Sequence, residues 1–228
     1  MTIPSGITEW RSRSGSLGTS LAWTQGGASN LQPVYATAVA SLNGKNAVQF
    51  DGTDDYFDTN NANAWKFLHD GTGASRFFIW RIDSTGGATM RYGQSQDSSA
   101  SEIGISESNG AAAVTMRVAN GSGTFVNNYT TAPSGHYARD VSRWQMWGYA
   151  TGTQHSRVSG SLLTNADTGG QSPSSSNPTR TYRLGASASG ALPFKGYIAQ
   201  DIYYDHVLTA GELTSLVNFF APIYGVSV

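Results

Sequence analysis

Residues 101–126 have the sequence SEIGISESNGAAAVTMRVANGSGTFV, and this stretch decides the fold class. Within residues 114–118, valine and methionine alternate with threonine and arginine, which is the pattern of a β-strand with one buried face. The Asn-Gly pairs at 109–110 and 120–121 favour hairpin turns, because both residue types tolerate the positive φ that these turns require. The stretch therefore predicts antiparallel strands joined by tight turns.

Strand and turn signals continue on both sides of this meander. Residues 76–82 (RFFIWRI) predict a strand buried on both faces near the centre of a sheet, and residues 143–149 (RWQMWGY) predict another with bulk on both faces. Trp144 and Trp147 fall on opposite faces of that second strand, since neighbouring strand positions alternate. Further strands are predicted at residues 47–50, 56–58, 156–163, 182–185 and 194–204, and a long exposed loop at residues 168–179.

One helix is predicted near the C-terminus. Residues 209–212 (TAGE) form a capping box, in which the Thr209 hydroxyl accepts a backbone N–H and Glu212 reaches back to the cap. We expect Pro222 to limit the helix length. The predicted apolar face of the helix consists of Leu213, Leu216, Val217 and Phe220. One short helix among many strands indicates an all-β sandwich, which we expect to fill residues 1–228 as a single domain.

Composition narrows the function classes. Charged residues make up 13% of the chain, against a usual ~25%, and the formal net charge is -1. With no basic run, the sequence argues against nucleic-acid binding and against electrostatic docking on anionic membranes. The chain has no cysteine, so it holds no disulfide or thiol nucleophile. Residues 1–6 do not resemble a Sec-type signal peptide and no apolar run is long enough to span a membrane. If the protein works outside a cell, release within a virus particle is one route.

Three motifs carry a resemblance to a known superfamily. Residues 42–56 (LNGKNAVQFDGTDDY) resemble its signature strand and turn, residues 144–165 its central hairpin, and residues 194–212 its closing strand and capped helix. The chain is similar to the concanavalin A-like, laminin-G-like jelly-roll superfamily from about residue 7 onward. This resemblance implies two antiparallel sheets with a concave face that often binds glycans. Such modules are also similar to domains of bacteriophage fibres, spikes and capsid decorations.

One pattern in the sequence points to an enzyme. Laminarinase-like glycosidases, which share the jelly roll, carry a Glu-x-Asp-x-x-Glu strand with nucleophile and acid/base at its ends. Glu102 and Glu107 match the two ends, but Gly104 stands at the position of the aspartate. Retaining chemistry needs carboxyl groups ~5–5.5 Å apart on one face. Residues five apart on a regular strand point to opposite faces, so only a bulge would bring the two together. We therefore do not expect an enzyme.

Clustered carboxylates offer a calcium site as an alternative to a turn. Asp51, Asp54, Asp55 and Asp58 lie close together in the sequence, and calcium takes several carboxylate oxygens. Some members of the superfamily bind calcium. The same residues also favour a turn, because aspartate side chains accept hydrogen bonds from their own backbone. We expect no other cofactor, since the four histidines show no metal-binding spacing.

Aromatic side chains are the better lead for ligand binding. The faces of sugars stack on Trp and Tyr, whose rings are apolar with a polar edge. Trp147, Tyr149 and Tyr203 are candidates for an exposed binding platform, and the alternative for each is packing between the two sheets.

The leading hypothesis is a non-enzymatic surface module of a phage-like particle. Its expected partners are virion capsid or tail proteins and cell-surface glycans, without nucleic acid or membrane insertion. Its expected place is the virion surface or the extracellular space. The alternatives are a laminarinase-like glycoside hydrolase and a purely structural capsid decoration protein. The sequence leaves open whether the chain forms a homo-oligomer.

Overall fold

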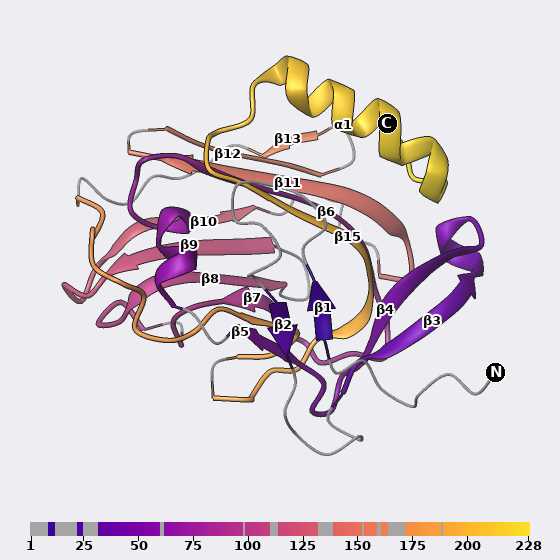
Figure 1. Ribbon diagram of the computed structural model, residues 1–228, viewed down its shortest axis with the longest axis horizontal. Helices are drawn as coiled ribbons and strands as arrows, with labels where there is room; N and C mark the ends of the chain where they lie inside the picture. Colours follow the sequence, from indigo (N-terminus) through magenta and orange to yellow (C-terminus); the bar gives the residue numbers. More distant parts are fainter. Residues whose placement is uncertain are drawn as a thin grey trace.

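The computed structural model describes residues 9–11, 22–24, 32–59, 62–97, 99–109, 114–131, 139–151, 153–158, 161–163, 172–187 and 189–228. These residues form two antiparallel sheets stacked face to face, with one α-helix outside them (Figure 1). The structure is the two-sheet jelly-roll β-sandwich with a C-terminal helix that the sequence predicted. In the described part of the chain, no helix is both long and apolar enough to cross a membrane.

Eight strands form sheet A. Its strands, in spatial order, are β1 (Glu9–Arg11), β2 (Ala22–Thr24), β5 (Phe57–Thr59), β14 (Arg183–Leu184), β7 (Met90–Gln94), β8 (Ile103–Asn109), β9 (Val114–Asn120) and β10 (Phe125–Thr131). The predicted meander is its β8–β9–β10 portion. The predicted alternation is confirmed there, because Val114, Met116 and Val118 all point into the core between the sheets.

Seven strands form sheet B. In spatial order they are β13 (Ser161–Leu163), β12 (Thr153–Val158), β11 (Ser142–Ala150), β6 (Ala74–Ile82), β15 (Lys195–Tyr204), β4 (Lys45–Asp51) and β3 (Val34–Val39). Two short 3-10 helices, η3 (Ala40–Leu42) and η4 (Asn63–Leu68), lie in the connections. The prediction for residues 76–82 is confirmed, since β6 is the middle strand and is buried on both faces. The single strand predicted at 156–163 is instead two strands, β12 and β13.

Two apolar cores hold the fold together. The inter-sheet core fills the sandwich and contains Trp80 and Trp147, both without exposed surface. The second core lies between sheet B and α1 (Ala210–Tyr224) and contains Trp144 and Val217. Figure 1 shows the helix lying across sheet B on the side away from sheet A. The two tryptophans of β11 therefore serve different cores, as their opposite strand positions predicted.

The helix begins as predicted and ends later than predicted. Thr209 accepts the Glu212 N–H, and the Glu212 side chain accepts the Thr209 N–H, so the capping box is confirmed. The expectation that Pro222 limits the helix is wrong, because the helix continues through Tyr224. Tyr224 is buried against sheet B and accepts a hydrogen bond from Gln200, which favours the extra residues. Gly225 ends the helix at φ 65°, a left-handed conformation that glycine adopts without strain.

Candidate functional site

The outer face of sheet A carries polar side chains on three neighbouring strands. On β8, Ile105 and Glu107 point into the sandwich, so the serines beside them point outward. Directly paired residues of antiparallel strands share a face, so the partners of these serines on β7 and β9 lie outward too. We call the six residues the polar face. It consists of one row, Gln94, Ser106 and Arg117, and a second row, Arg91, Ser108 and Thr115.

Most of the polar face is buried although it lies outside the core. Gln94 and Ser106 have no exposed surface, and Arg91 exposes 7% of its own. Nε and Nη1 of Arg91 and Oε1 of Gln94 form no hydrogen bond with any residue that the structure describes. The same holds for Oε1 of Gln96, whose Nε2 donates to Ser106 Oγ at 3.2 Å. Because a buried polar atom without a partner costs roughly 1–3 kcal/mol, a further partner would stabilise this face.

The polar face contains two arginines, Arg91 and Arg117. Burial lowers the pKa of Arg91, the charge of Arg117 lowers it further, and the charge of Asp97 opposes both. Arg117 is half-buried, and its guanidinium lies 5.2 Å from the centre of the Phe125 ring. Asp97 Oδ1 accepts a long hydrogen bond of 3.4 Å from Gln94. The charges of Arg117 and Asp97 therefore act on Arg91 in opposite directions.

Ion pairs border the polar face on the side of β14. Arg183, which is paired in register with Gln94, binds Asp58 at 2.7 Å. Arg180 binds Glu102 at 2.7 Å, and Arg180 holds the pKa of Glu102 below its usual range. These four charges neutralise one another pairwise.

The Glu102–Glu107 pair that the enzyme alternative requires does not form. Glu102 lies just before β8 and binds Arg180 on the outside of the sheet. Glu107 has no exposed surface and lies inside the sandwich. The two carboxyl groups point to opposite faces of sheet A because no bulge intervenes between them on β8. The glycosidase alternative therefore lacks the geometry on which it was based.

Glu107 instead belongs to a buried charge network that the sequence analysis missed. Arg76 of β6 donates to Glu107 at 2.5 Å and to both oxygens of Asp201 at 2.6 and 3.0 Å. Tyr182 donates to Glu107 at 2.8 Å, and Tyr203 donates to Asp201 at 2.9 Å. Burial raises the pKa of Glu107, and Arg76 opposes the rise. The network joins sheet A to sheet B through Arg76 and is closed to solvent.

The predicted aromatic platform is wrong for two of its three residues. Trp147 and Tyr149 expose 0% and 1% of their surface, because β11 turns both into the inter-sheet core. Tyr203 is partly buried. Its ring packs edge-on against Trp65 and Tyr182, and its hydroxyl is engaged inside the network. None of the three offers a free ring face like that of a sugar-binding platform.

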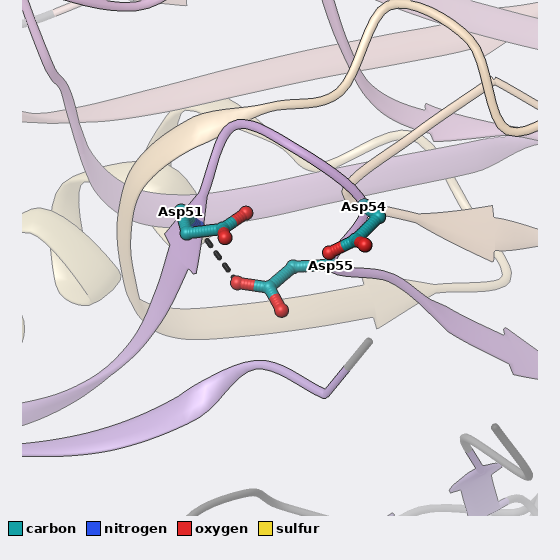
Figure 2. Close-up of side chains that lie close together, drawn as sticks. All are labelled: Asp51, Asp54 and Asp55. Carbon is teal, nitrogen blue, oxygen red and sulfur yellow. Dashed lines mark hydrogen bonds between the residues drawn. The ribbon is translucent and has the colours of Figure 1, made fainter. Parts of the chain in front are cut away.

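The carboxylates of Asp51, Asp54 and Asp55 do lie together, at the end of β4 and in the turn that follows it (Figure 2). One oxygen from each falls within 4.8 Å of the others. Figure 2 shows the Asp55 carboxylate accepting the Asp51 backbone N–H, a bond of 2.7 Å. Burial raises the pKa of Asp55 to about 6, although this hydrogen bond lowers it, and the charges of Asp51 and Asp54 add to the rise. Asp58 binds Arg183 instead and is not part of the cluster.

The cluster fits a calcium ion only in part. Calcium takes 6–8 oxygen ligands, and three carboxylates supply a minority of them. Asp51 Oδ1 already accepts the Thr53 N–H at 2.7 Å, as the turn alternative predicted. Calcium binding by Asp51, Asp54 and Asp55 therefore stays a prediction.

The polar face escaped the sequence analysis for a definable reason. The alternation of Thr115 and Arg117 with apolar residues was visible, but it indicated only an outward face. The outward position of Arg91 between Met90 and Tyr92, both in the core, is a similar signal that would have placed it on the same side. No local sequence pattern shows that β7 and β9 both pair with β8, which is what brings their outward side chains onto one face.

Comparisons with known proteins identify the fold and no family. No family model matches the sequence, and no curated protein matches it significantly. Among solved structures, the chain is similar to the CBM40 of the Ruminococcus gnavus IT-sialidase bound to alpha2,3 sialyllactose, with a TM-score of 0.58 and 19% identity. That match covers 75% of this chain and 95% of the other.

Two further structures show the same architecture. The binding domain of botulinum neurotoxin serotype D matches with a TM-score of 0.60 and 9% identity over 95% of this chain and 51% of its own. A mutant of the NanB sialidase from Streptococcus pneumoniae matches with a TM-score of 0.56 and 14% identity, over 74% of this chain and 27% of the sialidase. At these sequence identities, the similarity shows that the chains share the β-sandwich fold and nothing further.

Proposed function

We propose that this chain is a non-enzymatic binding module that recognises a glycan through the polar face of sheet A. The observation that carries the proposal is a set of buried polar atoms that have no partner among the described residues. They belong to Arg91 and Gln94 of that face and to Gln96, which donates to Ser106. Sugar hydroxyl groups both donate and accept hydrogen bonds, so one glycan can satisfy guanidinium N–H groups and amide oxygens together. The ligand approaches this face beside Arg117, which is half-buried.

The solved structures of the same fold support this class of ligand. The CBM40 is bound to alpha2,3 sialyllactose, and the serotype D neurotoxin structure is a binding domain. Fold alone does not decide function, because unrelated sites are built on one fold. The polar face is the feature of this chain that makes the same type of function physically reasonable.

The setting that we propose is the surface of a bacteriophage particle, in a capsid decoration, fibre or spike. The support for this setting is the resemblance of the strand, hairpin and capped-helix motifs to phage surface domains. A sequence with 13% charged residues suits such a setting. The partners in this proposal are capsid or tail proteins on one side and host-surface glycans on the other.

A glycan array that includes bacterial surface polysaccharides tests the proposal, with and without calcium. The wild type is expected to bind a defined subset of glycans. A Gln94→Leu variant, which removes the buried amide of the row that also contains Ser106 and Arg117, is expected to lose most of that binding. The matched control is Asn218→Ala, an exposed position on α1 on the far side of sheet B.

Two results would count against the glycan proposal. The first is the absence of binding to every glycan on the array by a folded wild-type protein. The second is equal binding by wild type and Gln94→Leu, which would move the site away from the polar face. Loss of binding without calcium would assign a role to Asp51, Asp54 and Asp55.

The structural-decoration alternative has one supporting observation on α1. Phe219 is 64% exposed and packs edge-on against Phe220, beside Leu216 and Tyr204. An exposed apolar surface of this kind is typical of protein contacts. Retention of a Phe219→Ser variant on purified particles, at the level of the wild type, would remove this support.

A further inference from the structure

We propose that a groove beside α1 binds a segment of a partner protein in which a basic side chain lies near an apolar one. The groove and the polar face of sheet A are on opposite sides of the sandwich, because α1 covers sheet B on the side away from sheet A (Figure 1). The inference therefore goes beyond the proposed glycan site and does not depend on it. It names the chemistry of the partner that fits the exposed apolar surface around Phe219.

The groove runs along one side of α1, next to the last residue of β15. Its volume is about 560 Å³, within the range of roughly 300–1,000 Å³ that is typical of ligand pockets. Phe219 is 64% exposed and packs edge-on against Phe220, which in turn stacks on Phe77 of sheet B. The Phe219 ring is therefore held in place although most of it faces solvent. The apolar lining of the groove consists of Tyr204, Leu208, Leu216 and Phe219.

Carboxylates border this apolar lining at the N-terminal end of α1. Glu212 lines the groove with 46% of its side chain exposed, and Asp205, which follows Tyr204 in the chain, exposes 73% of its side chain. His206 lies between them, with Nε2 3.1 Å from Glu212 Oε1 and Nδ1 3.5 Å from Asp205 Oδ1. Hydrogen bonds from Thr209 hold the pKa of Glu212 below its usual range. Burial raises the pKa of Tyr204 and the charge of Glu212 adds to the rise, so this charge acts on the wall of the groove.

The segment that lines the groove carries negative charge and no basic side chain. Between residues 196 and 228 the sequence contains no lysine or arginine. Its acidic residues are Asp201, Asp205 and Glu212, and Asp201 is paired with Arg76 inside the sandwich. Even a protonated His206 would leave an excess of negative charge beside the groove. A basic side chain therefore complements this surface, whereas an anionic membrane surface does not.

The distance between the carboxylates and the exposed ring indicates how the partner segment is built. Glu212 and Phe219 are seven positions apart on α1, which is nearly two turns, so they lie on the same side and about 10 Å apart along the axis. An extended chain advances about 3.3 Å per residue, so the basic and the apolar side chain of the partner are expected two to four positions apart. An arginine can also lie over an aromatic ring, which Tyr204 and Phe219 provide.

A second copy of this chain is a poorer occupant of the groove. In a two-fold dimer the same surface patch of each copy meets the other. The carboxylates of Asp205 and Glu212 in one copy would then approach those of the second copy, and like charges across an interface repel each other. A different protein with a basic segment avoids this repulsion.

A random library of twelve-residue peptides, displayed on ribosomes and selected on the whole purified protein, tests the inference. The selected peptides are expected to carry lysine or arginine two to four positions from leucine, isoleucine, methionine or phenylalanine. Fluorescence polarisation with one labelled peptide then measures its affinity for each variant. Phe219→Ser and the double variant Asp205→Asn, Glu212→Gln are each expected to weaken binding about tenfold or more. Glutamine at position 212 can keep the capping box, so the double variant removes charge without removing the helix cap.

Two matched controls are expected to bind the peptide as tightly as the wild type does. Thr214→Ala changes an exposed position of α1 that does not line the groove. Asp54→Asn removes one carboxylate near the other end of β15. Asp51, just before it at the end of β4, pairs with Lys195, the first residue of β15, whereas the groove lies at the last.

Three results would overturn the inference. The first is a selection that yields no binding peptide, or peptides without enrichment of basic residues. The second is unchanged affinity in both Phe219→Ser and the double variant, which would place the peptide elsewhere on the protein. The third is a concentration-dependent dimer in analytical ultracentrifugation that Phe219→Ser abolishes, which would make a second copy the occupant. None of these results bears on the glycan array, so a failure of this inference and a failure of the proposed function are distinguishable.

Discussion

Replacing Arg76 with methionine is expected to destabilise the protein strongly. The Arg76 guanidinium donates one hydrogen bond to Glu107, at 2.5 Å, and two to Asp201, at 2.6 and 3.0 Å. The side chains of Arg76 and Glu107 are 0% exposed, and that of Asp201 is 3% exposed. Methionine keeps the apolar stem but leaves two carboxyl groups in the sandwich without a cation.

The magnitude follows from the burial of the network. Removing one partner of a buried ion pair costs about 3–5 kcal/mol, which is a large part of the 5–15 kcal/mol that holds a typical domain folded. Burial raises the pKa of Glu107 even with Arg76 present, and the variant removes the opposing charge. A carboxyl group whose pKa is raised by folding contributes stability while it is protonated, and that stability is lost as the pH rises through the folded pKa. The cost of Arg76→Met should therefore be larger at pH 8 than at pH 5.

Urea unfolding followed by tryptophan fluorescence at the two pH values measures this cost. The matched control is Arg180→Met, because the Arg180–Glu102 pair is partly exposed, at 41% and 17%, and such pairs contribute about 0–1 kcal/mol. A cost for Arg76→Met no greater than that of the control, or one that does not grow with pH, would refute the buried network as the link between the sheets.

Three further predictions concern local features. Asp55→Asn is expected to gain stability relative to the wild type as the pH rises through about 6, because the raised pKa of Asp55 makes its ionisation in the folded protein unfavourable. Urea unfolding at pH 5 and pH 8 checks this. If the carboxylate cluster binds calcium, adding calcium should stabilise the wild type and not the variant. Thr209→Ala should cost about 1 kcal/mol in thermal unfolding by removing the helix cap, and Thr209→Ser should restore most of it. Gly93→Ala should cost about 1–3 kcal/mol, because the new Cβ would overlap the Tyr182 hydroxyl oxygen; a wild-type melting temperature would contradict this packing.

Sequence reasoning worked best where one element decides its own structure. The capping box at Thr209 and the apolar face of α1 depend on residues within one helix turn of each other. The opposite orientations of Trp144 and Trp147 follow from strand geometry alone. Pro222 was misjudged, because the packing of Tyr224 against sheet B outweighs the local effect of proline.

The candidate site was harder to predict, because its contacts join distant segments. Arg76 and Asp201 are 125 positions apart in the chain, as are Asp58 and Arg183. Glu102 and Glu107 were correctly placed on opposite faces by strand alternation, but their partners Arg180 and Arg76 come from other strands and loops. The juxtaposition of Arg91 and Arg117 exists only because β8 lies between β7 and β9.

The sequence by itself determined the all-β class, the meander, the capped helix and the side of each strand on which a residue falls. These properties depend on backbone geometry that repeats every two residues in a strand and every 3.6 in a helix. Only the tertiary structure decided which face of each strand is buried by other parts of the protein. The stacking of sheet B on sheet A buried Trp147 and Tyr149 and enclosed Glu107 with Arg76, while strand order gathered Arg91 and Arg117 on one face. Burial and partner choice depend on non-local packing, which no local pattern of residues contains.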